Sequence, residues 1–479
     1  MNIQKTFYYF AFLLFFCKQS FGENLTIDQY ISQVKGENLN IEKTQKSTES
    51  YDLLKKKAEL VNAIKLYGFS EFIKSEPNRA LQFVRFDSLI NQNNRIGISQ
   101  TSKYGFTTNF YYSLNSTRYS NFNPSFNTNS LAGHNYQVVP VVEINLSLWQ
   151  NFLGKNTQAK INNIFYENLA KNYFAKALTL QELINAEKSF WVMVYAQKTY
   201  EIKKRALIGT EKILNYIAKK VRMNLAEKSD VLQAKADVES KKLSLNQAEN
   251  FLKISARDFN KRRNINSDKI DEKLEEFDIN KLINLKYKTS KQSDRLDIKS
   301  DQANLESLIA LAKIEEDNNK PALNLYASYS VNQVEAKRNL AINNSFDRNA
   351  PNSKIGVEFS MPLNFGLSSA IRKGSSIKAS SDKIAMREKL FQQEIDWTNL
   401  QQNLHDYQEN LKLAKQIEEI QKVKFENEFK LLSQGRTSTY QILAFGQELL
   451  NAELNTQNLA QKFNELIIEL KLYQSENNL

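Results

Sequence analysis

Two stretches of alternating polarity stand out in the sequence: YGFTTNFYYSLNST at residues 104–117 and YQVVPVVEINLSLW at residues 136–149. Apolar and polar side chains follow one another at nearly every step, as Asn109 and Phe110 do in the first stretch. A period of two residues, kept over a whole segment, predicts a β-strand with one apolar and one polar face. Residues 120–135 are rich in Asn, Ser and Phe and predict a long loop between the strands.

The same arrangement returns later in the chain. Residues 322–334 and 353–365 alternate in the same way, around a polar loop at about 335–352. A shift of 215 positions (324 − 109 = 215) aligns Asn109 with Asn324 and brings the strand pairs into register. This self-similarity predicts an internal duplication. The two expected repeats are residues 23–262 and 263–479.

Long helices are predicted after each strand pair. Residues 155–223 and 367–434 contain no proline, and each segment contains one glycine, Gly209 or Gly374. A helix of this length extends about 100 Å at 1.5 Å per residue, which is longer than an ordinary globular domain. We therefore expect a chain that is mainly α-helical, with a smaller β portion.

The helices that follow are predicted to pack as coiled coils, because their apolar residues recur every seven positions. Lys241 and Thr456 stand where this pattern calls for an apolar residue. The recurring positions are Val231, Val238, Leu245, Leu252 and Phe259 in the first repeat and Ile442, Leu449, Phe463 and Leu470 in the second.

Each long helix is expected to turn back on itself at a helical hairpin tip. Asn224 and Gly435 both tolerate the left-handed conformation that ends a helix. The residues suited to begin the next helix are Ser229 and Asp230 in the first repeat and Ser438 and Thr439 in the second. The expected tip turns span about 223–230 and 434–441.

The N-terminus indicates export from the cytoplasm. An apolar run at residues 7–17 follows Lys5, and small residues precede a cleavage point after Gly22, so residues 1–22 read as a secretory signal peptide. Cleavage there removes the only cysteine, Cys17. A lipid anchor on Cys17 is a rival interpretation, which the bulky phenylalanines before it disfavour.

The residue inventory predicts no enzyme, metal site or cofactor. The chain has two histidines and one cysteine, and it has neither zinc-ligand spacing nor a phosphate-binding glycine loop. His405 and Glu409 share a helix face, which is too few ligands for a closed metal site. We therefore expect no catalytic, cofactor-binding or metal-binding residues.

The chain is basic, with a formal net charge of +12 and a pI near 9.2. The cluster Lys261, Arg262 and Arg263 is of a kind that binds nucleic acid. Export and the dispersed alternation of Lys with Glu favour a solvated helix surface instead. We therefore expect no nucleic-acid partner.

Strands with one apolar aromatic face are typical of outer-membrane barrels. Four strands cannot close a barrel, and an open edge in lipid leaves backbone groups unpaired. We therefore expect several copies of the chain to pool their strands, with Glu143 and Glu358 facing a wet lumen. The expected lipid-facing residues are Phe106, Phe110, Tyr112, Val142, Ile144, Leu325, Tyr329, Val357, Phe359 and Met361.

Several loose motifs occur in a doubled order along the chain. They are residues 25–28 (LTID), 361–366 (MPLNFG) with a weaker counterpart at 146–149 (LSLW), and the tip segments 224–236 and 435–448. In this order and spacing the chain resembles the TolC-like outer membrane efflux proteins over essentially its whole mature length.

This resemblance implies a homotrimer in the outer membrane of a Gram-negative bacterium. Three sets of four strands would form a 12-stranded barrel, and the helices would form a tunnel across the periplasm. The tips would meet a periplasmic adaptor protein, which couples the duct to an inner-membrane transporter for efflux or type I secretion. The sequence does not distinguish among small toxic compounds, metal ions and polypeptides as cargo.

The resemblance also implies a gate at the tips, where members of the family carry acidic residues. Asp230 matches that pattern in the first repeat, but a shift of 211 (435 − 224 = 211) places Gln441 in the second. Asp230 is equally suited to stabilise the start of its own helix. The remaining tip candidates are Arg222, Asn224, Lys228, Gly435, Arg436 and Tyr440.

An alternative from another class is a secreted structural protein outside any membrane, in which long helices form a rod with small β modules. In that case the apolar strand faces would lie inside a dry core. The two hypotheses differ in whether the mature protein is recovered with the outer membrane.

Overall fold

The computed structural model describes residues 24–76, 87–120, 134–287, 291, 294–331, 334–347 and 350–473. The predicted signal peptide and most of the predicted loop at 120–135 lie outside the described residues. The chain divides into two compact units. The first comprises residues 1–47, 175–296 and 391–479, and the second comprises residues 48–174 and 297–390.

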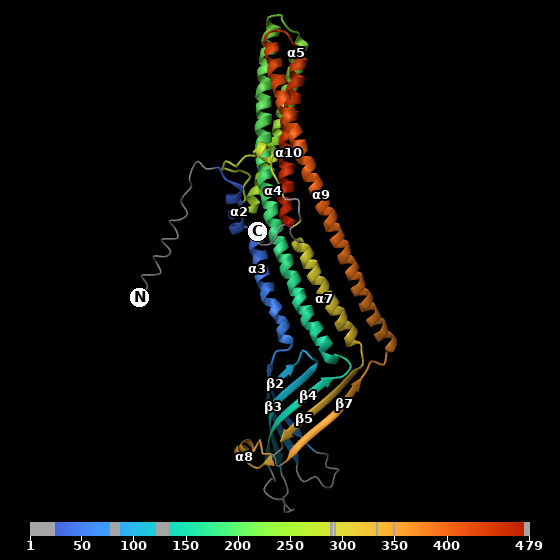
Figure 1. The fold of residues 1–479 in the computed structure, drawn as a ribbon. Coiled ribbons are helices and arrows are strands. Elements are labelled where there is room, and N and C mark those ends of the chain that lie inside the picture. The colour runs from blue at the N-terminus through green and yellow to red at the C-terminus, as the bar shows by residue number, and fades with distance from the viewer. Residues whose placement is uncertain are drawn as a thin grey trace, which may run out of the picture. The chain divides into compact units, whose positions relative to one another are not determined.

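The first unit is helical (Figure 1). Its two long helices, α4 and α9, correspond to the predicted helices 155–223 and 367–434 and have 68 and 69 residues. The prediction of two very long helices is therefore confirmed. Its elements are α2 (Ile27–Glu37), the start of α3 (Leu39–Leu54), the later part of α4 (Lys155–Arg222), α5 (Lys228–Arg262), α6 (Ile279–Ile283), the later part of α9 (Phe365–Ser433), α10 (Thr439–Glu469) and η3 (Leu470–Tyr473).

One aromatic cluster closes the core where α2, α4 and α5 meet. Tyr30, Phe190 and Phe259 are fully buried, and the Tyr30 and Phe259 rings stack with their centroids 4.3 Å apart. The Tyr30 hydroxyl donates to the Phe259 carbonyl oxygen at 2.9 Å. Burial raises the pKa of Tyr30 to about 12, so this hydroxyl keeps its proton and its donor role at every physiological pH.

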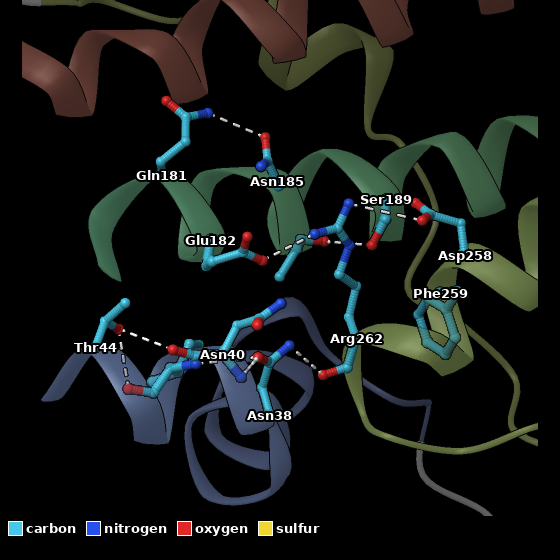
Figure 2. A network of polar contacts seen from close by, with 12 residues as sticks. Asn38, Asn40, Thr44, Gln181, Glu182, Asn185, Ser189, Asp258, Phe259 and Arg262 are labelled. Carbon is cyan, nitrogen blue, oxygen red and sulfur yellow. Dashed lines mark hydrogen bonds and ion pairs between the residues drawn. The ribbon is translucent and has the colours of Figure 1, made fainter. Parts of the chain in front are cut away.

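Two residues of the basic cluster, Arg262 and Arg263, pack against this core, whereas Lys261 is exposed. Arg262 forms ion pairs with Glu182 at 2.9 Å and with Asp258 at 3.6 Å, and its carbonyl oxygen accepts from Asn38 (Figure 2). Arg263 is buried against the Phe259 ring, with its guanidinium carbon 4.6 Å from the ring centroid. The interpretation of these two arginines as solvated helix surface is wrong, because both tie α5 to its neighbours.

The heptad positions are buried or half-buried, as the sequence predicts. Both exceptions to the pattern are buried polar side chains with partners. The Lys241 ammonium donates to Gln447 and lies 3.5 Å from Asp237. The Thr456 hydroxyl is fully buried and donates to the Ala452 carbonyl oxygen at 3.0 Å. A polar residue at such a position is tolerated only when its hydrogen bonds are satisfied.

The second unit is built around one antiparallel sheet with the strand order β1-β2-β3-β4-β5-β7, and β6 pairs with β4 beside it. The helical segments of this unit are the rest of α3, η1 (Lys55–Val61), η2 (Phe152–Gly154), the start of α4, α7 (Leu296–Asn318), α8 (Arg338–Asn343) and the start of α9. The strands are β1 (Lys65–Ser75), β2 (Ser88–Thr101), β3 (Phe106–Ser120), β4 (His134–Ser147), β5 (Ala322–Val331), β6 (Val334–Glu335) and β7 (Pro351–Ser360).

The strand count corrects the sequence prediction of four. β3, β4, β5 and β7 are the predicted strands, and β1 and β2 form an additional hairpin on the free side of β3. The predicted last strand also ends early. β7 stops at Ser360 and α9 begins at Phe365, because Pro362 has no N–H to donate to a strand ladder.

The aromatic core gives a first prediction. Phe190→Ala should destabilise the mature protein by about 3–5 kcal/mol, because truncation leaves a cavity against Tyr30 and Phe259. Phe190→Leu, which keeps most of the volume, should cost much less. The measurement is the denaturant midpoint of the helical circular dichroism signal in detergent. Equal midpoints for the two variants would contradict the packing described here.

Candidate functional site: the sheet faces and the helical tips

One face of the sheet is mainly apolar, and all six long strands contribute apolar side chains to it. The strand register places Phe110 opposite Val142 on β4 and opposite Ile98 on β2. Directly opposed residues lie on the same face of an antiparallel pair, so each pairing extends this surface by one strand. Its apolar members include Leu66, Ile96, Ile98, Phe106, Phe110, Val142, Ile144, Leu325, Tyr329, Ile355, Val357 and Phe359.

The predicted lipid-facing residues within the strands all fall on this face. Met361 lies just beyond the end of β7 and is exposed. The Tyr112 hydroxyl donates to Ser345 at 2.7 Å, and its ring stacks on Phe346, so the segment after α8 covers the sheet at that point. The residues placed on the face by the register are Phe106, Phe110, Tyr112, Val142, Ile144, Leu325, Tyr329, Val357 and Phe359.

The opposite face is polar and hydrogen-bonded between strands. The Glu143 carboxylate accepts from the Tyr111 hydroxyl at 2.8 Å and from the Asn109 amide at 3.4 Å. Ser99 on β2 donates to the side-chain oxygen of Asn109 at 2.6 Å, which extends the network to the additional hairpin. Glu358, the second acidic residue predicted here, lies on the same polar face.

Arg95 anchors the additional hairpin to this polar face. Its guanidinium carbon lies 5.6 Å from the ring centroids of both Phe69 on β1 and Tyr111 on β3. Sequence reasoning missed Arg95. The signal that could have revealed it is the short alternation from Arg95 to Ile98, in which Ile96 and Ile98 are apolar and the positions between them are not.

Both helical tips turn through the predicted residues. Asn224 has φ 53° and Gly435 has φ 75°, which is the left-handed conformation that ends α4 and α9. In each turn a backbone N–H reaches back into the helix: Leu225 to Lys220 and Arg436 to Leu431, both at 2.9 Å. These bonds satisfy carbonyl oxygens that a helix end leaves without a partner.

The helix that follows the tip turn begins differently in the two repeats: α5 in the first and α10 in the second. In the second, Ser438 caps α10 as predicted, since its hydroxyl accepts from the Gln441 N–H at 3.2 Å. In the first, the cap is Glu227 rather than Ser229, and the Asp230 carboxylate accepts from the Glu227 N–H at 3.3 Å. Asp230 therefore stabilises the start of α5 within its own chain.

The two tips are held together inside the first unit. The Tyr216 hydroxyl donates to the Leu432 carbonyl oxygen at 2.9 Å, and Lys220 reaches the same oxygen at 3.4 Å. Ile213, Ile217 and Ile442 pack beneath them in an apolar cluster. Residues that the sequence placed at the tip and that the structure leaves exposed are Arg222, Asn224, Lys228, Gly435, Arg436, Tyr440 and Gln441.

A cavity of about 280 Å³ lies among α4, α5, α9 and α10, next to this cluster on the side away from the tips. Its lining includes the buried Lys241 and the pair of Arg205 with Glu453, whose nearest atoms are 3.3 Å apart. Burial raises the pKa of Glu453, and the Arg205 charge opposes that shift. This cavity could not be predicted from the sequence, because its lining comes from four separate helices.

In the part of the chain that the structure describes, no three His, Cys, Asp or Glu side chains approach closely enough to hold a metal ion. Within the same residues, no helix has a stretch long and apolar enough to cross a bilayer.

No protein-family model matches this sequence, and comparison with curated proteins gives no relative. Solved structures do match its fold. The outer membrane protein VceC of Vibrio cholerae shares 13% identity, with 93% of this chain and 94% of VceC covered at a TM-score of 0.60. The CmeC outer membrane channel of Campylobacter jejuni shares 14% identity, with 96% of this chain and 89% of CmeC covered at a TM-score of 0.59. The MtrE outer membrane channel of Neisseria gonorrhoeae, in its open state, shares 12% identity, with 93% of this chain and 88% of MtrE covered at a TM-score of 0.61.

This is the fold of TolC-like outer-membrane channels. The match covers nearly the full length of each of these structures, so both the strands and the long helices of this chain belong to the channel fold. The resemblance stated from the sequence motifs is thereby confirmed at the level of the fold.

The tip turn gives a second prediction. Gly435→Ala should destabilise the end of α9 by about 1–2 kcal/mol, because a Cβ disfavours the left-handed conformation. Hydrogen exchange of the amides around the turn should accelerate accordingly. Gly209→Ala is the matched control, since Gly209 lies inside α4 with open space at the Cβ position and should gain helix stability. Slower exchange in Gly435→Ala would contradict the observed turn.

Proposed function

We propose that this chain is one subunit of a passive, homotrimeric exit duct in the outer membrane of a Gram-negative bacterium. The single observation that supports this most strongly is the mainly apolar face that extends over six long strands of a channel-fold sheet. In water such a surface would be unstable, whereas lipid tails would cover it. The polar face, with Glu143 and Arg95, then lines a wet lumen.

The long helices extend the duct into the periplasm, where most of the chain would lie. The exposed tip residues would meet a periplasmic adaptor that couples the duct to an inner-membrane transporter, for efflux or type I secretion. Cargo would pass without chemical change, so no catalytic group is required. The residue inventory fits a conduit better than an enzyme.

The alternative, a secreted structural protein outside any membrane, requires another protein surface over the apolar face. The residues on that face are exposed in the single chain: the exposed fraction is 47% for Ile144, 63% for Val357 and 54% for Phe359. Lipid is the simpler cover, because each of the six long strands contributes at least one aliphatic or aromatic side chain to this face. Fractionation distinguishes the two hypotheses.

Mature protein produced with its leader in a Gram-negative host should be recovered from the outer membrane as a heat-modifiable trimer. Val142→Arg, on the apolar face, should reduce that yield, because a charge facing lipid at mid-depth costs about 2–4 kcal/mol. Ser328→Arg is the control, because Ser328 lies on the polar face opposite Glu143. A soluble monomer, or equal loss in both variants, would contradict the proposed duct.

We further propose that charged tip residues hold the duct closed between neighbouring subunits, with Asp230 contributing a negative charge to the positive side chains around it. Asp230→Asn keeps an oxygen acceptor for the Glu227 N–H but removes the charge. We expect it to raise single-channel conductance in planar bilayers with little loss of stability. Asp230→Ala should raise conductance and also destabilise α5 by about 0.3–1 kcal/mol. Wild-type conductance in Asp230→Asn would assign the residue to helix capping alone.

A further inference from the structure

The additional hairpin occupies the edge at which a four-stranded set would join its neighbour. β2 pairs with β3 over its whole length, from Ser88 opposite Ser120 to Thr101 opposite Thr107. Side chains reinforce the junction, since Ser99 bonds to Asn109 and Arg95 lies over the Tyr111 ring. The β3 edge is therefore already filled within the chain.

The free edges of the sheet lie elsewhere. Among the described strands, β1 pairs only with β2 and β7 pairs only with β5. Both edges are exposed and have nearly equal lengths, 11 and 10 residues. Their backbone groups need partners if the apolar face meets lipid, since no water is present there to satisfy them.

The two edges are complementary in direction. The sheet has an even number of consecutive antiparallel strands, six, so β1 and β7 run in opposite senses. The β1 edge of one copy can therefore join the β7 edge of the next as a further antiparallel pair. The alternation of every strand is then preserved around a closed ring.

The two edges are also complementary in side chains. Aligning the strand ends that adjoin the helices, Lys65 with Ser360, places Leu66 opposite Phe359 on the apolar face. On the polar face the same register places Glu71 opposite Lys354. An apolar contact on one face and an opposite-charge pair on the other both favour this register.

We infer that β1 of each chain pairs with β7 of a second copy, so that each subunit contributes six long strands to the shared wall, and a trimer encloses 18 strands rather than twelve. This inference rests on the proposed membrane duct. Barrel diameter grows roughly linearly with strand number, so the lumen would be about half as wide again as that of a 12-stranded ring. Barrels of 16–18 strands leave an aqueous channel, which suits a wide exit.

Disulfide trapping tests the seam directly, because Cys17 is the only natural cysteine and falls in the predicted leader. The first pair is Glu71→Cys with Lys354→Cys, and the second is Leu66→Cys with Phe359→Cys. Neighbouring cross-strand pairs alternate between hydrogen-bonded and non-hydrogen-bonded sites, and these two pairs fall on different types. One of them therefore has the closer Cβ atoms that a disulfide needs.

We expect at least one of the two pairs to give reducible dimers and closed trimers on denaturing gels after oxidation of outer membranes. A short bismaleimide should give the same ladder even with a slip of two residues, because it spans the diagonal distance of about 7–8 Å. Each single-cysteine variant should stay monomeric on the gel.

The control pairs are Ser113→Cys with Lys354→Cys and Thr108→Cys with Phe359→Cys. They probe a seam made by β3 instead of β1. Cross-links in the controls, or an outer-membrane trimer that links at neither seam, would overturn the six-strand inference while the duct itself stands. A wild-type protein recovered only as a soluble monomer would overturn the proposed function instead.

Discussion

Every backbone N–H and C=O along a strand needs a hydrogen-bond partner, and the architecture of the sheet depends on how the six long strands meet that need. Inside the sheet, each of the strands β2, β3, β4 and β5 is hydrogen-bonded to a neighbouring strand on both sides. At β1 and β7 one side of the ladder is open. In water such edges are tolerated at some risk of aggregation, but in lipid they cost several kcal/mol for each unpaired group. The chain is therefore incomplete by itself if it enters a membrane.

The helical unit meets the same requirement locally, because a helix pairs its own backbone groups except at its ends. Those ends are closed by Asn224 and Gly435 at the turns and by Glu227 with Asp230 and by Ser438 at the next helix starts. Packing beyond that is carried by apolar heptad positions and by a few buried polar side chains, of which Lys241 and Thr456 are examples. Such packing accommodates small rotations, whereas a strand ladder does not, which is the physical reason for proposing that the duct is gated at its tips.

The strands that sequence reasoning found and the strands that it missed differ in their patterns. In β3 and β4 aromatic and branched residues recur at every second position, and the prediction was accurate to within a few residues. In β2 only Ile96 and Ile98 mark the apolar side at its centre, and Asn94 and Gln92 interrupt it. In β1 the neighbouring Phe72 and Ile73 break the alternation altogether. A two-residue period cannot be recognised when one face is partly polar, so only pairing with β3 revealed the hairpin.

The sequence by itself determined the long helices, the positions of both tip turns, four strands and the apolar side of each, because these follow from local periodicity and from residues that favour particular backbone angles. It also determined that the inventory is poor in catalytic and metal-binding side chains. The tertiary structure alone decided the additional hairpin, the burial of Arg263 and the ion pairs of Arg262, the cavity around Lys241, and the identity of the free edges. These features depend on which distant segments come together, and a residue's neighbours along the chain do not specify its neighbours in space.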